Sequence, residues 1–292
     1  MNIKSGFGLL KEAFNEWKDD DALELGAALA YYTIFSIAPM LLVVIAIVGL
    51  IYGREAVQGQ IVGQIQGLVG RQGAEAVQTM LANAGQQKGT GIWATVVGLV
   101  TILFGATGVF VQLQSSLNRV WDVQVKKDRG VVKGLVKARI AAFGMLLGIG
   151  FLLLVSLVVS TLVAGLGEYA NRLFPGAEVL IKILTFVLSF GLATVLFAMI
   201  YRFLPDVKIQ WRDVWFGAGV TALLFAIGKY LIGLYLGNSS VASTYGAAGS
   251  LVILLLWIYY STQILFFGAE LTQAWAKHHG SRIEPSKDAV PV

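Results

Sequence analysis

The chain has 292 residues, of which 57% are apolar and only 13% are charged. A soluble domain of this length carries about 25% charged residues, so this composition argues strongly against a free soluble protein. The sequence contains no cysteine, which excludes disulfides, thiolate metal ligands and a cysteine nucleophile. The net charge is +5, and in a membrane protein the position of those charges matters more than their sum.

Residues 1–24 are largely polar and predict an amphipathic helix at the cytoplasmic face of a membrane. Its apolar side chains recur at steps of three and four residues and are Ile3, Phe7, Leu10, Phe14 and Trp17. Aromatic residues on one face are typical of a helix that lies in the membrane interface. Packing against the protein's own cytoplasmic face is the alternative interpretation. Asp19, Asp20 and Asp21 follow and are expected to cap the first membrane helix.

Six charge-poor runs are long enough to cross the hydrocarbon core, which takes about 20 residues of helix. They cover residues 25–53, 91–118, 140–167, 183–201, 214–238 and 245–269. Helices are expected because the backbone polar groups of a spanning segment must be satisfied internally. The predicted fold class is therefore all-α, a polytopic membrane protein with a six-helix transmembrane domain over 25–270 and a cytoplasmic polar tail over 271–292.

The distribution of basic residues predicts the orientation of the chain. Sixteen Lys and Arg residues fall at the N-terminus, in the second and fourth connections and in the tail, whereas five fall in the other connections. Cytoplasmic segments are enriched in basic residues, so both termini are expected to be cytoplasmic. We expect a multi-pass membrane protein.

The first outer connection, residues 54–90, is too long for a simple loop and predicts a helical hairpin on the extracytoplasmic side. Its first helical face is formed by Val57, Ile61, Ile65 and Leu68, and a second short helix is expected after Gly70 and Gly73. The hairpin is expected to dip into the membrane, to cap a central cavity, or to form a packed lid without a role in transport.

Ionisable groups inside membrane spans are costly and are often functional. Lys229 lies sixteen residues after Asp213, about 24 Å along the fifth span, where it either snorkels to the outer surface or faces a cavity. Glu270 ends the sixth span near the cytoplasm, and Gln263 lies two turns deeper on the same face. The expected partners of Glu270 are the basic side chains at that level, Arg119, Arg202 and Arg212.

Several motifs at the ends of the predicted spans resemble those of one family. They are GAALAYYTIFSIAP at 26–39, LNRVWD at 117–122, YRFLPD at 201–206, WRD at 211–213, YGAAGS at 245–250, LWIY at 256–259 and GAEL at 268–271. Together they are similar to the YihY/BrkB family of bacterial inner-membrane proteins, formerly labelled ribonuclease BN, over residues 14–276. The resemblance implies a six-helix bundle with both termini inside. It also implies either a ribonuclease or virulence role, or the movement of lipids or lipid-linked glycans in the envelope.

The residues themselves argue against an enzyme. Metal-dependent hydrolysis needs clustered His, Asp or Glu side chains, but the two histidines, His278 and His279, are adjacent in the tail and do not face each other on a helix. No phosphate-binding or nucleophile-elbow motif is present. The sequence therefore predicts no catalytic residues, no metal site, no cofactor and no specific nucleic-acid partner. The basic second connection suits anionic lipid headgroups.

The leading functional hypothesis is translocation or export of a lipid or lipid-linked amphiphile. Arg119, Arg202 and Arg212 would receive a headgroup phosphate at the inner face, and Lys229 would receive it further out. One alternative is a small-ion or solute transporter, for which Gln263 and Glu270 would line the path. Another is a non-transporting scaffold. Membrane lipids are the expected partners, together with a homo-oligomer or a periplasmic envelope protein.

Overall fold

The computed structural model describes residues 3–86, 92–126, 131–173, 177–238, 245, 248–280 and 283–292. Most of the described chain is helical. The helices are α1 (Ile3–Asp19), α2 (Ala22–Tyr52), α3 (Arg54–Gln86), α4 (Ile92–Val120), α5 (Val131–Leu173), α6 (Ala177–Phe203), α7 (Trp211–Asn238) and α9 (Gly249–His279). Four short strands complete the described elements: β1 (Val123–Val125), β2 (Val207–Lys208), β3 (Glu284–Pro285) and β4 (Ala289–Pro291).

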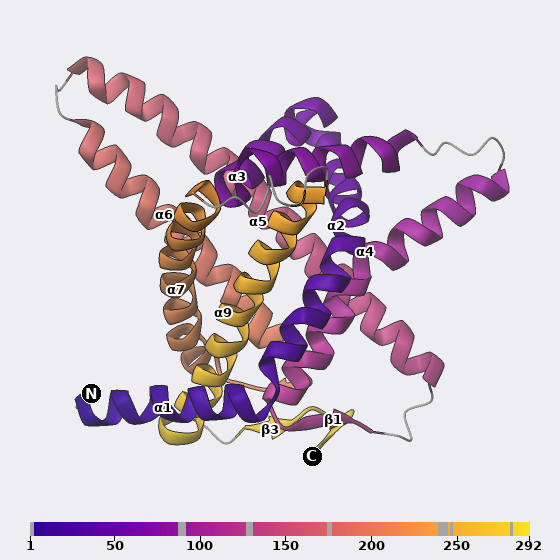
Figure 1. The fold of residues 1–292 in the computed structure, drawn as a ribbon, viewed down its shortest axis with the longest axis vertical. Coiled ribbons are helices and arrows are strands. Elements are labelled where there is room, and N and C mark those ends of the chain that lie inside the picture. Colours follow the sequence, from indigo (N-terminus) through magenta and orange to yellow (C-terminus); the bar gives the residue numbers. More distant parts are fainter. Residues whose placement is uncertain are drawn as a thin grey trace.

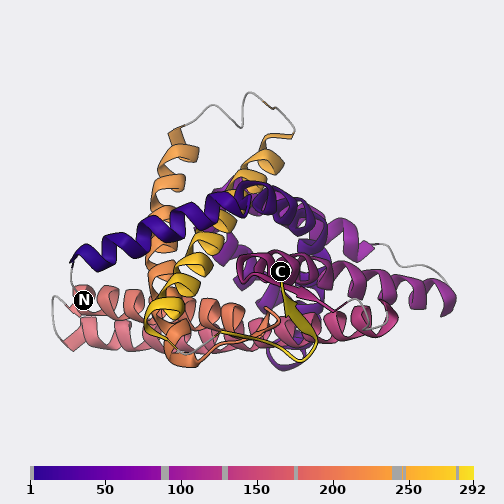
Figure 2. The ribbon, with the colours of Figure 1, turned by 90° about the horizontal axis from the view of Figure 1, so that it is seen from below.

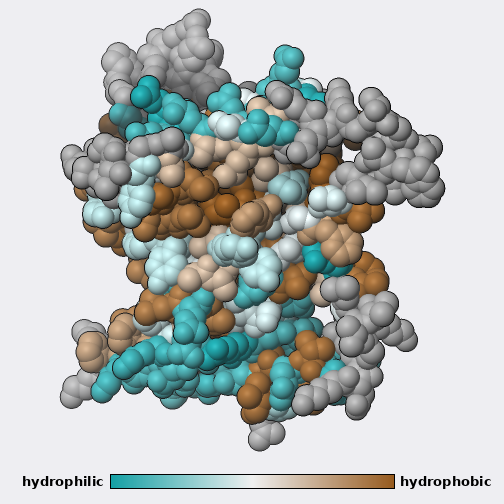
Figure 3. All heavy atoms as spheres, turned by 45° about the vertical axis from the view of Figure 1, so that its right-hand side comes forward, coloured by the Kyte–Doolittle hydropathy of each residue, from teal (hydrophilic) through white to brown (hydrophobic). Residues whose placement is uncertain are grey.

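The helices are those of a membrane protein. Among the described residues, α2, α4, α6, α7 and α9 are long and apolar enough to cross a bilayer. The third predicted run falls in α5, where the described apolar stretch Ala138–Leu152 is shorter than a full span. Figure 3 shows a broad apolar belt between two polar ends, which is the surface that a bilayer requires. The membrane class is confirmed, and the number of six crossings stays a prediction.

The elements outside the bundle gather at its two ends (Figure 1). One end carries α1, the strands and both chain termini, and we call it the terminal end. The opposite end is covered by α3. Seen from below in Figure 2, α5 and α6 run side by side along one edge of the bundle. The long connection between α2 and α4 therefore forms a cover on the face opposite the termini.

Glycine and aspartate residues with positive φ mark the turns between helices. Gly53 (φ 82°) ends α2, and Gly70 (φ 76°) divides α3 into two helical segments, because these conformations are strained for residues with a side chain. Asp21 (φ 52°) precedes α2, but its side chain makes no capping hydrogen bond within the described chain. The expected aspartate cap is therefore wrong, and Asp21 pairs with a distant arginine instead.

The helix α1 confirms the packed interpretation of the N-terminal pattern, and its place in the membrane interface stays a prediction. Leu9 and Ala13 are buried against Leu271 and Ala274 of α9. The aromatic side of the helix remains exposed, with Phe7 and Phe14 at 72% and 55% exposure. One face of α1 is thus packed on the protein, and a second face is free to contact lipid headgroups and acyl chains.

The C-terminal residues pair with two loops at the terminal end. The helix α9 continues past Glu270 as far as His279, so the segment predicted as a polar tail begins inside this helix. Strand β4 then pairs antiparallel with β1, and β3 pairs with β2. Residues 283–292 therefore join the loop after α4 to the loop after α6.

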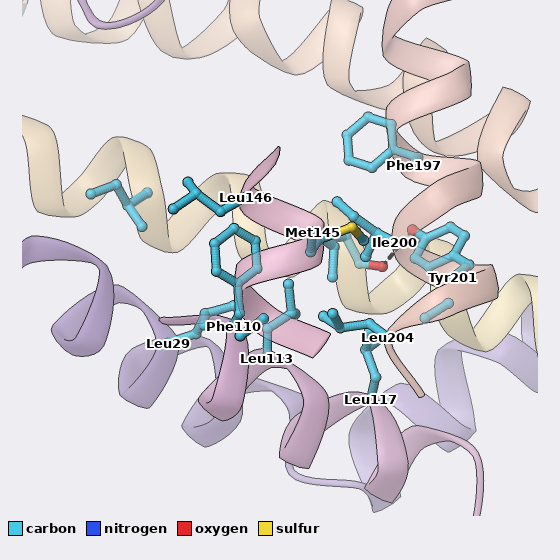
Figure 4. Packing of buried hydrophobic residues seen from close by; sticks show 14 of the residues in the cluster. Leu29, Phe110, Leu113, Leu117, Met145, Leu146, Phe197, Ile200, Tyr201 and Leu204 are labelled. Atoms are coloured by element: carbon cyan, nitrogen blue, oxygen red, sulfur yellow. Dashed lines mark hydrogen bonds between the residues drawn. The ribbon is translucent and has the colours of Figure 1, made fainter. Parts of the chain in front are cut away.

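The main core lies between α2, α3, α4, α5, α6, α7 and α9. Figure 4 shows part of it, where Phe110 and Leu117 of α4 meet Met145 of α5 and Tyr201 of α6. The Tyr201 hydroxyl donates to the carbonyl oxygen of Leu265 in α9 at 2.8 Å, so even the polar atom of this buried ring is satisfied. This packing fixes the helix ends that carry the polar residues below.

Candidate functional site

A cavity of about 900 Å³ lies between α3, α5, α6 and α7. Its lining is mostly apolar and includes Phe186, Phe190, Leu192, Ala193, Ala222, Phe225, Ala226 and Leu234. The polar residues of its wall are Gln64, Ser156, Ser189, Lys229 and Tyr230. Because α3 covers the end of the bundle opposite the termini, the cavity belongs to that half of the molecule.

Lys229 supplies a cation in the wall of this cavity. The sequence left open whether this lysine faces a cavity or snorkels to the surface. Its side chain is exposed and is part of the cavity wall, so both positions stay open to this long, flexible side chain. The cavity wall thus combines mostly apolar side chains with the positive charge of Lys229.

Two of the family-like motifs bind each other at the terminal end. The Asn118 side-chain amide donates to Oδ2 of Asp206 at 3.0 Å, and the Asp206 backbone N–H donates to Oδ1 of Asn118 at 2.7 Å. Gln114 donates to the same carboxylate oxygen at 3.2 Å. This reciprocal pair joins the end of α4 to the loop after α6.

Arg119 is paired with two aspartates at this end of the bundle. Its Nη2 donates to Oδ2 of Asp21 at 2.6 Å, and its Nε lies 3.9 Å from Oδ1 of Asp20. The α1–α2 turn is thereby tied to the end of α4. The predicted role of Arg119 as a receiver of phosphate would require release of these carboxylates.

A second polar link lies between α9 and the loop after α4. Gln273 donates to Oδ2 of Asp122 at 3.0 Å, and Nζ of Lys277 lies 3.6 Å from the same oxygen. A smaller cavity of about 430 Å³ adjoins these residues and is also lined by Ile283 and Pro285. The C-terminal strands therefore form part of the wall of this pocket at the terminal end.

Glu270 has none of the partners that the sequence predicted for it. It is 0% exposed, and in the described part of the chain neither carboxylate oxygen accepts a hydrogen bond from an N–H group or an alcohol hydroxyl. Its carboxyl group lies within hydrogen-bonding reach of the carboxyl group of Asp20. The expected contacts with Arg119, Arg202 or Arg212 are therefore wrong. The reason is geometric, since Glu270 lies beside Asp20 of the α1–α2 turn, where Arg119 is already held by aspartates.

Gln263 shares this inward position on α9. Its side chain presses against Gly26 of α2, where an added Cβ would lie within van der Waals overlap of the amide. Neither polar atom of Gln263 has a partner among the described residues. Gln263 and Glu270 thus form a buried polar stripe that faces the start of α2 and the turn before it.

Arg202 and Arg212 lie at the terminal end without joining this stripe. Arg202 is in the last turn of α6, and its Nε is buried with no hydrogen-bond partner within the described ranges. Arg212 is exposed in the first turn of α7. The predicted site residues are therefore divided, with Lys229 at one cavity and the arginines and Glu270 at the opposite end.

Asp20 and the Asn118–Asp206 pair were not predicted as site residues. Burial raises the pKa of the Asp20 carboxyl above its ordinary value of 3.8, and the nearby Asp122 acts in the same direction. Asn118 and Asp206 belong to the motifs LNRVWD and YRFLPD, so the motif positions were visible in the sequence, but their contact was not.

The chain is similar to proteins whose names record only a membrane location. The model of the family described as virulence factor BrkB matches residues 13–291. A UPF0761 membrane protein of Chromohalobacter salexigens is 29% identical over 269 residues, covering 91% of this chain and 62% of the relative. A UPF0761 membrane protein of Pseudomonas paraeruginosa is 32% identical over 259 residues, covering 86% of this chain and 59% of the relative.

A third UPF0761 membrane protein, from Alteromonas mediterranea, is 28% identical over 260 residues, with 87% of this chain and 83% of the relative covered. The chain spans about three fifths of the length of the first two relatives. No solved structure matches the chain significantly. The family match over nearly the whole chain agrees with the resemblance carried by the motifs, and the chain therefore belongs to the YihY/BrkB family of integral membrane proteins.

Proposed function

We propose that this protein moves an anionic lipid or lipid-linked amphiphile across the bacterial cytoplasmic membrane. The observation that carries the proposal is the position of Lys229 in the wall of a largely apolar cavity of about 900 Å³. An amphiphile can keep its acyl chains in the bilayer, so only its headgroup needs a polar path. A lysine in an apolar wall is costly unless an anion or water meets its charge.

The cavity suits this substrate class in both size and chemistry. Its aromatic and aliphatic wall, which includes Phe186, Phe190 and Phe225, can accept acyl or prenyl chains. Ser156 and Ser189 line the same cavity as Lys229 and offer hydroxyl groups for the oxygens of a phosphate headgroup. We propose no catalytic step for this site, and the purified protein is expected to leave RNA intact.

We further propose that six helices cross the membrane, with both termini in the cytoplasm. The antiparallel pairs β1–β4 and β2–β3 support this topology, because they bring the loop after α4, the loop after α6 and the C-terminal residues to one end. Helices α5 and α6 then leave that end and return to it. The excess of Lys and Arg in these same segments supports a cytoplasmic position.

The proposal is tested by lipid movement in liposomes that contain the purified protein. Fluorescent anionic phospholipid in both leaflets is quenched from outside, and loss of the protected inner-leaflet signal measures translocation. The wild-type chain is expected to accelerate this loss over empty liposomes. Lys229→Ala should abolish most of the acceleration, whereas Lys229→Arg should keep it.

Lys182→Ala provides a matched control, because Lys182 is an exposed lysine of α6 that does not line the cavity. Wild-type protein that performs no better than empty liposomes would refute translocation by this chain alone. Equal rates for Lys229→Ala and Lys182→Ala would refute the role of Lys229.

A further inference from the structure

The buried carboxyl group of Glu270 requires a physical explanation. Both of its oxygens lie away from solvent and accept no hydrogen bond from an N–H group or an alcohol hydroxyl in the described chain. An ionised carboxylate in such a place would lose its hydration without compensation, which is among the most costly arrangements in a protein. A proton on the group, or a proton shared with a neighbour, removes most of that cost.

The neighbour is Asp20, whose carboxyl lies close enough to interact directly with Glu270. The Asp20 side chain is 19% exposed, so it connects the buried group to the solvent at the terminal end. Two carboxyl groups that interact directly cannot both ionise readily, because their like charges repel. Burial also raises the pKa of the Asp20 carboxyl above its ordinary value.

The other charged groups around the pair offset its negative charge only in part. They come from every element that packs there and are Glu16 of α1, Asp21 of the turn, Arg119 of α4, Asp122 after α4 and Lys277 of α9. Arg119 is engaged by Asp20 and Asp21, and Lys277 lies against Asp122. Negative charge therefore predominates around Glu270, and a proton is the cation that the arrangement can accommodate.

We propose that Asp20 and Glu270 form a proton-binding site that holds the α1–α2 turn against α9. With one proton shared between the two carboxyl groups, the turn stays closed over the buried end of Glu270. Loss of the proton leaves two like charges together and separates the turn from α9. This site is at the opposite end of the molecule from the Lys229 cavity, so proton binding is independent of whether the chain moves lipid.

Infrared spectroscopy of the wild-type protein tests the protonation directly. Uniform labelling with carboxyl-¹³C glutamate should shift a protonated carboxylic acid band that is present at neutral pH. Glu270→Gln should remove this band, and Glu75→Gln should keep it, since Glu75 is exposed and pairs with Arg71. If the wild-type spectrum at neutral pH contains no carboxylic acid band that shifts with the glutamate label, the proposal is overturned.

The closing of the turn is tested by cysteine labelling, for which the cysteine-free sequence is well suited. Ala22 at the start of α2 is 1% exposed, so Ala22→Cys should react slowly with a maleimide at neutral pH. As the pH rises, labelling should accelerate several-fold more in the otherwise wild-type chain than in the Glu270→Gln chain. The Glu270→Gln protein corrects for the ionisation of the thiol. If the labelling rates of the two proteins depend on pH in the same way, the proposal is overturned.

Discussion

Replacing Asn118 by alanine removes the bond that joins two family motifs across the terminal end. The wild-type side chain is 6% exposed and makes two hydrogen bonds with Asp206, one to the carboxylate and one from the backbone N–H. A hydrogen bond to a charged group contributes about 1.5–3 kcal/mol, and a neutral bond contributes about 0.5–1.5 kcal/mol. We therefore expect Asn118→Ala to cost about 2–4 kcal/mol.

The assay is thermal unfolding of the purified protein in detergent, followed by circular dichroism. A loss of this size should lower Tm by roughly 5–15 °C. Gln114→Ala is the matched control, because Gln114 makes a single, longer bond of 3.2 Å to the same carboxylate and should cost about 1.5 kcal/mol, the lower end of the range for a charged group. If the two variants melt at the same temperature, the reciprocal pair does not hold the two motifs together.

Three further changes test other contacts. Gly217→Ala places a Cβ in overlap with Thr272 and should cost about 1–3 kcal/mol in thermal unfolding. Gly219→Ala, which meets no described atom within 4 Å, should not destabilise, and an equal loss in both would contradict close α7–α9 packing. Burial raises the pKa of Asp20, so the folded state gains stability in acid and loses it as the pH rises through that pKa. Asp20→Asn should therefore raise Tm at neutral pH and leave it unchanged in acid. If the Tm of the wild type and that of the variant change with pH in parallel, ionisation of Asp20 does not affect stability. Deleting residues 283–292 removes β3 and β4, so limited proteolysis should cut the loops after α4 and α6 faster, and unchanged rates would show that the strands do not protect them.

The membrane class and most of the helices could be predicted from the sequence because their signal is local. A charge-poor run of about 20 residues identifies a candidate span wherever it lies in the chain. The break at Gly70 was expected as well, since glycine is the residue that accepts this conformation. Lys229 was likewise recognisable as the one charge inside a predicted span.

The contacts of the terminal end could not be predicted in the same way. Arg119 pairs with a residue 98 positions away, and Gln273 bonds Asp122 at a separation of 151 positions. Neither pairing leaves a periodic signal in the sequence. The strands have only two or three residues each, which is too short to show alternation. Glu270 was therefore assigned to arginines by its depth alone, and the aspartate beside it was missed.

The cavity route itself is tested most directly by filling the cavity while leaving Lys229 in place. Ser189 is exposed on α6 and lines the cavity, whereas Thr185 is exposed one turn earlier and does not. In the liposome assay, Ser189→Trp should reduce translocation of anionic lipid to the rate of empty liposomes, and Thr185→Trp should keep the wild-type rate. Wild-type translocation by the Ser189→Trp protein would contradict passage through this cavity.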